Sequence, residues 1–405
     1  MGVVGNEHGL RQELDAVLSA GGGVARLEPA WVARDFLPPG RRLGLPESAY
    51  DVGERGFICE RWLGSTTKAD NRVGPPDEGL SQLSGDNGER LSLKDAVEAD
   101  PVAVMGAAYA AAHPNGLGRL AKLFDYGARL PYHIHPPQRF ASLVGQRSKD
   151  EAYHFPSGVD MGAHPESFFG VHPWIAREGA HETLLPYLVD WDSDLILRHA
   201  SAELLVAGEG YLIPSGVLHA PGTALTLELQ EDSDVLAMFQ ALNAGRIISK
   251  DLLFKDVRAE DRRRDGERFP LGFVEWKLNG DPFFYENHHL SPQPVEGPEA
   301  RDGASESWIF YNTTKFSGKR LVVPPGREVS CVERGVYTLL VWSGAGSYAG
   351  HEVRGRDADL DELLVTHEAA VSPHGVRNTG LDDLVVYKFF GPDINPDAPT
   401  SRTWA

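Results

Sequence analysis

The 405-residue sequence contains only two cysteines, Cys59 and Cys331. Two cysteines are too few for a disulfide framework, which favours the reducing cytoplasm as the location. Long apolar runs are missing as well, and none approaches the roughly 18 residues that a membrane span needs. The N-terminal stretch MGVVGNEHGLRQELDAVL has no basic segment followed by an apolar one, which argues against a secretory signal. We therefore expect a cytoplasmic protein with no membrane partner.

Basic residues are also scarce. The chain has 39 lysines and arginines against 58 aspartates and glutamates, which gives a formal net charge of −19. Nucleic-acid binding needs a basic surface to meet the phosphates, so this balance excludes a nucleic-acid partner. It leaves open a small anionic substrate, which a few local cations suffice to hold.

Glycine and proline are plentiful, with 44 and 28 copies, and they separate many short β-branched or aromatic runs. This rhythm is typical of a mainly β protein built as a sandwich or barrel. The Ala-rich stretch 92–114 is the main exception and predicts a helix pair broken at Pro101, with Ser92 as N-cap. Segment 258–270 is highly charged and predicts a surface linker or an exposed helix. Beyond it, strand-turn-strand patterns repeat those of the first half, which suggests a second barrel.

A pair of histidines one residue apart marks the first candidate site, in RLPYHIHPPQRF. Side chains alternate along a strand, so His133 and His135 lie on one face. The segment KDEAYHF follows closely and adds Glu151 and, as a weaker candidate, His154. Imidazoles and a carboxylate on a rigid sheet face suit a divalent metal. The alternative is a polar strand edge with solvated histidines.

The stretch GEGYLIPSGVLHAPG supplies a further histidine. A strand, a Pro-Ser-Gly turn and another strand place His219 just after the turn, where antiparallel pairing can bring it beside the other ligands. We predict one divalent ion held by His133, His135, Glu151 and His219. Three nitrogens and one oxygen suit zinc, which we expect first, and also iron, manganese, nickel or cobalt.

These motifs, in their order, resemble the type I mannose-6-phosphate isomerases of the cupin superfamily over roughly residues 55–240. The matching segments are Glu60-Arg61-Trp62, LSLKDAVEADPVAVMG, RLAKLFDYGARLPYHIHPPQRFA, KDEAYHF, YLIPSGVLHAPG and LELQEDSDV. The resemblance implies two cupin jelly-roll barrels with a small helical insertion. We expect a metal-binding domain over 1–257 with helices at about 92–114, a linker over 258–290 and a metal-free barrel over 291–405.

The resemblance also implies roles for residues outside the metal set. Glu228 and Lys122 match positions that face the family's pocket, and we expect proton transfer from the first and substrate anchoring from the second. Met238 stands where the family has an active-site arginine, and Arg246 is either the residue that replaces it or an ordinary surface arginine. Pro131 stands where a serine near the substrate phosphate is common, and His133 takes a glutamine position.

The function implied is metal-dependent aldose–ketose isomerisation of a sugar or sugar phosphate, so the expected partner is a small carbohydrate. A cupin dioxygenase with a three-histidine, one-glutamate iron site is one alternative, and a non-catalytic sugar-binding cupin is another. The C-terminal region has Cys331 and Glu333 where a cupin carries its paired histidines, and we do not expect His351 and His374 to ligate together. A homo-oligomer is left open.

Overall fold

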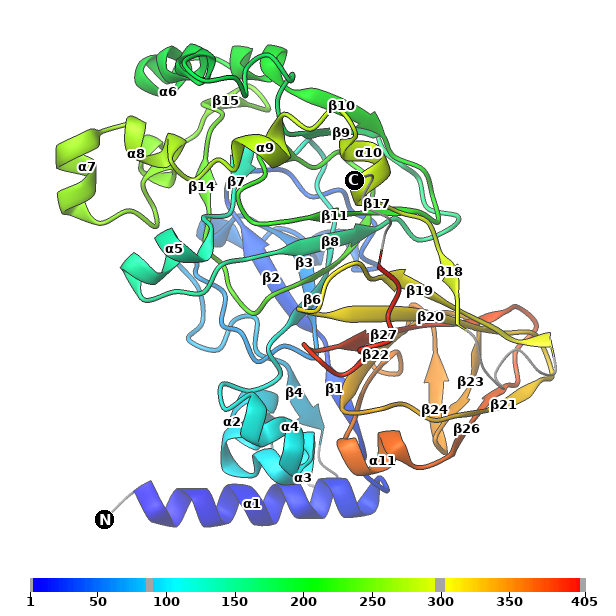
Figure 1. The fold of residues 1–405 in the computed structure, drawn as a ribbon. Coiled ribbons are helices and arrows are strands. Elements are labelled where there is room, and N and C mark those ends of the chain that lie inside the picture. Colours follow the sequence, from blue (N-terminus) through cyan, green and yellow to red (C-terminus); the bar gives the residue numbers. More distant parts are fainter. Residues whose placement is uncertain (1–2, 85–89, 296–302, 401–405) are drawn as a thin grey trace. The chain divides into compact units, whose positions relative to one another are not determined.

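The computed structural model describes residues 3–84, 90–295 and 303–400, which form strands in several antiparallel sheets together with short helices (Figure 1). The chain divides into two compact units. Of the described residues, unit 1 comprises 3–32, 61–84, 90–122, 292–295 and 303–400, and unit 2 comprises 33–60 and 123–291. The fold is mainly β, as the sequence predicts. None of the described helices is both long and apolar enough to cross a membrane.

The larger sheet of unit 1 joins strands from both ends of the chain. β1 pairs with β25 through the partners Val24 and Val365, so the N-terminal segment lies beside the C-terminal one. The strand order is β18 (Gln293–Pro294), β19 (Ser305–Phe310), β20 (Ser317–Val323), β27 (Leu384–Phe390), β22 (Tyr337–Ser343), β25 (Glu362–Val365), β1 (Val24–Glu28), β4 (Gln82–Ser84) and β5 (Arg90–Ser92).

The smaller sheet of unit 1 has the order β21 (Glu328–Cys331), β26 (His374–Asn378), β23 (Ala345–Tyr348) and β24 (His351–Arg354). Both sheets contribute to one apolar core, which includes Leu339 and Val341 of β22 and Val376 of β26. The helices of this unit are α1 (Val3–Ala20), α2 (Leu93–Ala99), α3 (Pro101–Met105), α4 (Ala107–Ala112) and α11 (His367–Val371).

The predicted helical segment 92–114 is confirmed, with one more break than expected. The Ser92 hydroxyl caps α2 by accepting a hydrogen bond from the Asp95 N–H. Pro101 stands at the start of α3, where its missing N–H costs nothing, and Asp100 caps this second helix. Gly106, with a φ of 78°, then ends α3, and α4 follows as a third helix.

Unit 2 places its candidate site between two sheets. The first has the order β17 (His289–Leu290), β11 (Gly210–Ile213), β8 (Glu151–His154), β13 (Thr226–Gln230), β6 (Leu120–Phe124), β3 (Phe57–Leu63) and β2 (Ala30–Arg34), and the chain passes from one unit to the other within the last three strands. The second has the order β10 (Ser201–Leu204), β9 (Glu166–Phe169), β12 (His219–Ala220), β7 (His133–Ile134) and β14 (Ala237–Met238).

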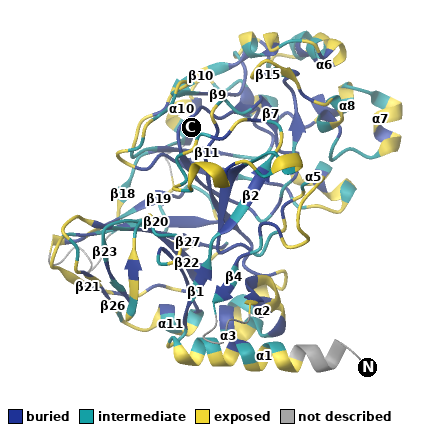
Figure 2. Ribbon diagram, turned by 180° about the vertical axis from the view of Figure 1, so that it is seen from behind, coloured by how far each residue is buried: buried dark blue, intermediate teal, exposed yellow. Residues whose placement is uncertain are grey.

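The rest of unit 2 is a hairpin and short helices. The hairpin pairs β15 (Leu242–Asn243) with β16 (Arg246–Ile247). The α-helices are α5 (Gln138–Ala141), α6 (Leu185–Asp190), α7 (Ala259–Asp265), α8 (Arg268–Leu271), α9 (Trp276–Asn279) and α10 (Phe284–His288). Only Asp261 of α7 is buried, so the charged segment 258–270 contains the exposed helix that was one of its two expected forms (Figure 2). The 3₁₀ turns are Glu47–Ala49, Gly53–Arg55, Ser142–Val144, Ala180–Leu184, Leu195–His199 and Lys250–Leu253.

The boundaries of the two units differ from those of the domains expected from the sequence. The expected segments 1–257, 258–290 and 291–405 are each continuous, whereas both units combine separate stretches of chain. Residues 61–122, including the three helices after Ser92, group with the C-terminal strands. The assignment of one cupin barrel to each expected segment stays a prediction.

Candidate metal centre

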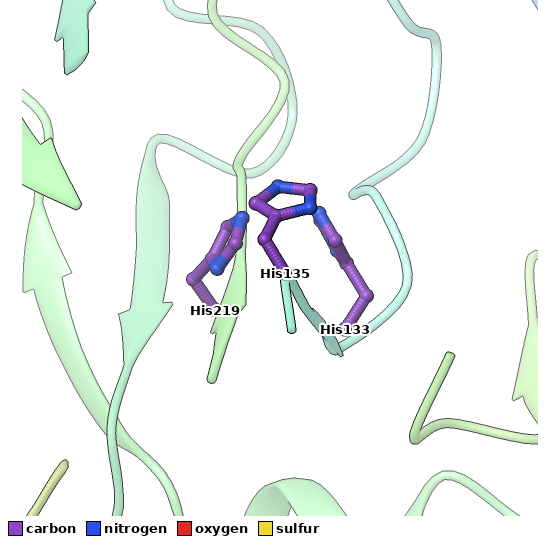
Figure 3. Close-up of side chains that lie close together, drawn as sticks. All are labelled: His133, His135 and His219. Atoms are coloured by element: carbon purple, nitrogen blue, oxygen red, sulfur yellow. The ribbon is translucent and has the colours of Figure 1, made fainter. Parts of the chain in front are cut away.

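The three strongest sequence candidates meet in unit 2. His219 on β12 is the direct cross-strand partner of His133 on β7, so their side chains share one face of the sheet. His135 follows β7, and its carbonyl accepts a hydrogen bond of 2.8 Å from the N–H of Gly216. Gly216 belongs to the Pro-Ser-Gly turn and has a φ of 84°, which a glycine adopts without strain. The turn therefore fixes His219 relative to His135 (Figure 3).

The histidine group is compact and buried. The ring centroids of His133 and His219 lie 4.1 Å apart, and those of His135 lie 5.2 and 5.1 Å from them. One ligand atom from each ring lies within 4.8 Å of the others. All three side chains are buried, and His219 has no exposed surface. Such convergence of imidazoles can hold a metal ion.

Backbone carbonyls fix the orientation of each ring. The Nδ1 atoms of His133, His135 and His219 lie 2.7, 2.7 and 2.9 Å from the carbonyl oxygens of Pro131, Val235 and Val217. A carbonyl oxygen can only accept, so each Nδ1 carries a proton, and in the neutral ring Nε2 then presents a lone pair. Two of these carbonyls lie two residues before the histidine that they hold, which makes the arrangement local to each strand.

Glu151 approaches two of these lone pairs. Its carboxylate oxygens lie 3.0 Å from His135 Nε2 and 2.9 Å from His219 Nε2. Neither Nε2 atom has a hydrogen-bond partner among the described residues. Burial lowers the pKa of His135 to about 4, with Lys149 acting in the same direction, so the ring is neutral at pH 7. Lone pairs facing a carboxylate repel unless a cation lies between them, so this donor set fits a divalent metal.

Lys149 is a functional candidate to which the sequence argument assigned no role. Its Nζ lies 2.8 Å from Glu151 Oε2 and 3.3 Å from Glu228 Oε1. Burial opposes the ammonium charge, but the two glutamates raise the pKa of Lys149 above its ordinary value. Although burial disfavours the ionised carboxylate, Lys149, then His135 and His219, hold the pKa of Glu151 well below its usual range. Lys149 thus links the expected metal ligand to the expected proton-transfer residue.

Glu228 lies on the same side of its sheet as Glu151. It is the cross-strand partner of Tyr153, as Gln230 is of Glu151, so alternation places these side chains on one face. The Tyr153 hydroxyl donates to Glu151 Oε1. Burial raises the pKa of Tyr153 well above 10, and the charge of Glu151 adds to it, so the phenol keeps its proton. Glu228 therefore lies close to Glu151, the carboxylate beside the histidine group, and to Lys149.

The other predicted residues take different positions. Lys122 is buried on β6, with its Nζ 6.0 Å from the ring centroid of Trp62. Arg246 is exposed on the β15–β16 hairpin. His154 is buried on β8 but lies outside the three-histidine group. Met238 on β14 is the cross-strand partner of His133, so a thioether stands beside the group where the resemblance implies a guanidinium.

A second arginine in unit 2 escaped the sequence argument. Arg34 on β2 contacts both carboxylate oxygens of Glu60, from Nε at 3.0 Å and from Nη2 at 3.2 Å. Its Nη2 also lies 3.8 Å from Asp234 Oδ1. Tyr126 donates its hydroxyl to the same Glu60. Arg34 thus lies between two carboxylates, those of Glu60 and Asp234.

Unit 1 buries a charged cluster of another kind. Lys388 Nζ lies 2.7 Å from both Glu306 and Glu333, and Lys319 Nζ lies 2.7 Å from Glu333 and 3.8 Å from Glu306. The Cys331 Sγ lies 3.7 Å from Lys388 Nζ. His351 and His374 have separate partners, because His374 Nε2 lies 3.1 Å from the Tyr337 hydroxyl and His351 Nε2 lies 3.1 Å from the Gly21 carbonyl.

No protein-family model matches the sequence, and no curated protein matches it either. Solved structures do match along most of the chain. Mannose 6-phosphate isomerase from Bacillus subtilis superposes with a TM-score of 0.61 at 16% identity, covering 90% of this chain and 99% of that one. A variant of phosphomannose isomerase from Salmonella typhimurium gives 0.58 at 13%, covering 91% and 100%.

A zinc-bound mannose 6-phosphate isomerase also matches, with a TM-score of 0.58 at 13% identity over 91% of this chain and 100% of that one. At sequence identities this low, the matches establish only that the fold is shared. The structural matches agree with the resemblance found in the sequence motifs. The two observations are independent, because a comparison of backbones does not use the motifs. The chain has the fold of the mannose 6-phosphate isomerases.

Proposed function

We propose that this protein is a metal-dependent aldose–ketose isomerase acting on a sugar or sugar phosphate. The observation that carries the proposal is the buried set of three histidines, two of which, His135 and His219, direct Nε2 at the Glu151 carboxylate. The fold likeness to isomerases that act on mannose 6-phosphate supports the choice of reaction.

The bound metal would polarise the carbonyl and hydroxyl oxygens of the sugar. His133, His135, Glu151 and His219 would hold it, with zinc as the first candidate. The chain's own task is then to move a proton between adjacent carbons, and Glu228 is placed for that step. Lys149 contacts both Glu228 and Glu151, and its charge helps to hold the pKa of Glu151 well below its usual range. Lys122 stays the proposed substrate anchor, and the exposed Arg246 stays a candidate for the same role.

We also propose that each unit is built on one cupin barrel, the first around the histidine group and the second around the core of unit 1. Antiparallel pairing within every sheet supports this assignment. A cytoplasmic location is consistent with the scarcity of cysteines, since the chain has only two and both are buried. The proposed partner is one small carbohydrate molecule.

The test is elemental analysis of the purified protein, followed by chelator treatment and reloading with zinc, iron, manganese, nickel or cobalt. Each form is then assayed against aldoses and ketoses with and without phosphate. One ion per chain and sugar isomerisation restored by reloading are the expected results. Oxygen uptake with iron alone, or tight sugar binding without turnover in any metal form, would contradict the isomerase assignment.

His154→Ala serves as the matched control, because it removes a buried histidine of the same unit from outside the group. It should retain its metal, whereas His219→Ala should lose it. Metal loss in both variants would place His154 in the site, and retention in both would remove the assignment.

A further inference from the structure

Gln230 is the last residue of β13 and lies beside the candidate metal centre. It is the direct cross-strand partner of Glu151, and it follows Glu228 by two residues on the same face of the sheet. Side chains opposite one another in an antiparallel pair have Cβ atoms about 5 Å apart. The partner of Glu151 on its other side is Ile213, which is apolar. Gln230 has no exposed surface, so its amide must find hydrogen-bond partners inside the unit.

The amide nitrogen of Gln230 fixes the orientation of the side chain. Its Nε2 donates hydrogen bonds to the carbonyl oxygens of Glu231 and Ser233, at 2.9 and 2.7 Å. An amide nitrogen carries two hydrogens, and these two carbonyls use both of them. The reversed amide would place its oxygen against two other oxygens, which excludes that orientation. Oε1 is therefore the end of the amide that needs a donor from elsewhere.

Oε1 of Gln230 is a buried acceptor that has no hydrogen-bond partner among the residues that the structure describes. The donors on this face contact other groups, because Lys149 lies against both Glu151 and Glu228. The Tyr153 hydroxyl donates to Glu151. A buried polar atom that has lost water and gained no partner costs free energy, so native proteins keep few of them. Such an atom beside a candidate site indicates that a ligand supplies the partner.

A second buried glutamine of the same unit shows the contrast. The amide nitrogen of Gln240 donates to the Leu242 carbonyl at 2.7 Å, and its Oε1 accepts from the Tyr132 N–H at 2.9 Å. Both ends of that amide are satisfied by backbone groups, so Gln240 has a structural role. Gln230 shares the structural contacts of the nitrogen and differs in its oxygen.

Only a group that carries a hydrogen can satisfy Oε1 of Gln230. A hydroxyl does so, whereas a carboxylate or a phosphate dianion presents oxygens that only accept. A sugar has several hydroxyl groups, and isomerisation uses the two oxygens on the reacting carbons. The metal would hold those two oxygens, and Glu228 would move the proton between the carbons. The hydroxyl left for Gln230 is therefore one farther along the sugar.

We propose that Gln230 accepts a hydrogen bond from one sugar hydroxyl through Oε1 and so selects for substrates that carry this hydroxyl. This inference rests on the proposed isomerase function and adds a substrate-binding residue to it. The two hydrogen bonds of Nε2 hold the amide in place before the sugar enters, so the acceptor is oriented in advance.

A series of deoxysugars tests the contact. Calorimetric titration gives the Kd of mannose and of its 3-deoxy, 4-deoxy and 6-deoxy forms for zinc-loaded wild type and zinc-loaded Gln230→Met. Wild type should bind one deoxy form about tenfold or more weakly than mannose, because Oε1 then stays buried without a donor. In Gln230→Met this penalty should disappear, and the other two deoxy forms should bind relative to mannose as in wild type. If the protein binds mannose 6-phosphate in place of mannose, the 3-deoxy and 4-deoxy forms of the phosphate are used.

Gln240→Met is the matched control, because it removes a buried amide of the same unit whose oxygen already has a donor. It should lose stability and keep the wild-type pattern of deoxy penalties. Loss of the penalty in both variants would show that the pattern depends on packing and would overturn the proposal. If Gln230→Met does not fold, Gln230→Asn replaces it, since the shorter side chain withdraws the oxygen and should also remove the penalty.

The outcomes separate this inference from the proposed function. Isomerisation with equal affinities for the parent sugar and all its deoxy forms overturns the role of Gln230 and leaves the isomerase standing, with a bound water as the partner of Oε1. Absence of turnover together with a penalty that depends on Gln230 contradicts the isomerase but supports the sugar contact. Binding of neither mannose nor mannose 6-phosphate to the loaded protein overturns both.

Discussion

Both units place charged side chains on the inward faces of β-strands, but they balance the charge in different ways. In unit 1, Lys319 and Lys388 alternate with Glu306 and Glu333, so two cations meet two carboxylates. In unit 2, three histidines and Glu151 converge, with Nε2 of His135 and of His219 about 3 Å from the carboxylate. The first cluster is complete with protein groups alone, and the second needs a cation.

The difference indicates how one architecture serves two purposes. A closed ion-pair cluster contributes little net stability, because desolvation offsets most of the attraction, yet removing one member is costly. A convergent set of acceptor atoms destabilises the metal-free protein, and metal binding restores the lost stability. Unit 1 should therefore respond to substitution through stability, and unit 2 through metal binding and activity.

The largest expected effect is the loss of metal from His219→Ala. The variant should contain no stoichiometric metal and show no isomerase activity, because one of three nitrogen ligands is gone. Wild-type protein should gain about 4 kcal/mol in the free energy of unfolding at a metal concentration near 1,000 Kd, and the variant should gain nothing. Elemental analysis and urea unfolding with and without metal measure both. Full metal content in the variant would show that His219 is no ligand.

Lys388→Met should give the largest loss of stability in unit 1. It leaves Glu306 and Glu333 buried with only Lys319 between them, and breaking such a cluster costs about 3–5 kcal/mol. Metal content should stay at the wild-type level. Lys388→Met combined with Glu306→Gln restores one cation for one carboxylate, so the double variant should be more stable than the single one. Additive losses would show that charge balance does not govern this core.

Lys149→Met tests the same logic in unit 2, where the outcome should depend on metal. Without metal, Glu151 and Glu228 lose their shared cation, so the free energy of unfolding should fall by up to about 3 kcal/mol. With metal bound, Glu151 keeps a positive partner, and the loss should be smaller. Urea unfolding of both forms measures the difference, and Lys149→Arg, which keeps the charge, is the control. Equal losses with and without metal would contradict the link between Lys149 and the site.

The sequence identified the histidine group because its signal is local. Alternation within one short strand places His133 and His135 on the same face, and a Pro-Ser-Gly turn indicates the position of His219. Lys149 and Arg34 were not recognised because their partners, Glu228 and Glu60, lie on other strands, and sheet order cannot be read from one strand. The boundaries of the units could not be predicted for the same reason, because β1 pairs with β25, a strand near the other end of the chain.

The charged core of unit 1 did leave a signal in the sequence. In LVVYKFF, Lys388 shares its parity with Leu384, Val386 and Phe390, all of which lie in the apolar core. A lysine at an inward position predicts a buried carboxylate partner. What the sequence could not supply was the identity of that partner, because Glu306 and Glu333 come from distant segments.

The smallest expected effect concerns a second charged cluster of unit 1, around Glu362. Its Oε1 accepts a 2.7 Å hydrogen bond from the Gly64 N–H, and its Oε2 lies 2.9 Å from Arg61 Nη2, which also serves Asp361. Burial raises the pKa of Glu362 from 4.5 to about 7, although Arg61 opposes the rise. The folded protein therefore binds a proton here that the unfolded chain has released between these two pH values.

This stabilisation should be complete below about pH 4.5 and should disappear as the pH rises through about 7. Since each pKa unit is worth about 1.4 kcal/mol, its full size is at most about 3 kcal/mol. Urea unfolding from pH 4 to 8 should show the wild-type advantage over Glu362→Gln shrinking across this window, because the amide does not titrate. Glu352→Gln, at an exposed acid of the same unit, should run parallel to wild type. A parallel profile for Glu362→Gln would mean that Arg61 keeps Glu362 ionised throughout, so that this cluster holds its charges fixed over the whole range.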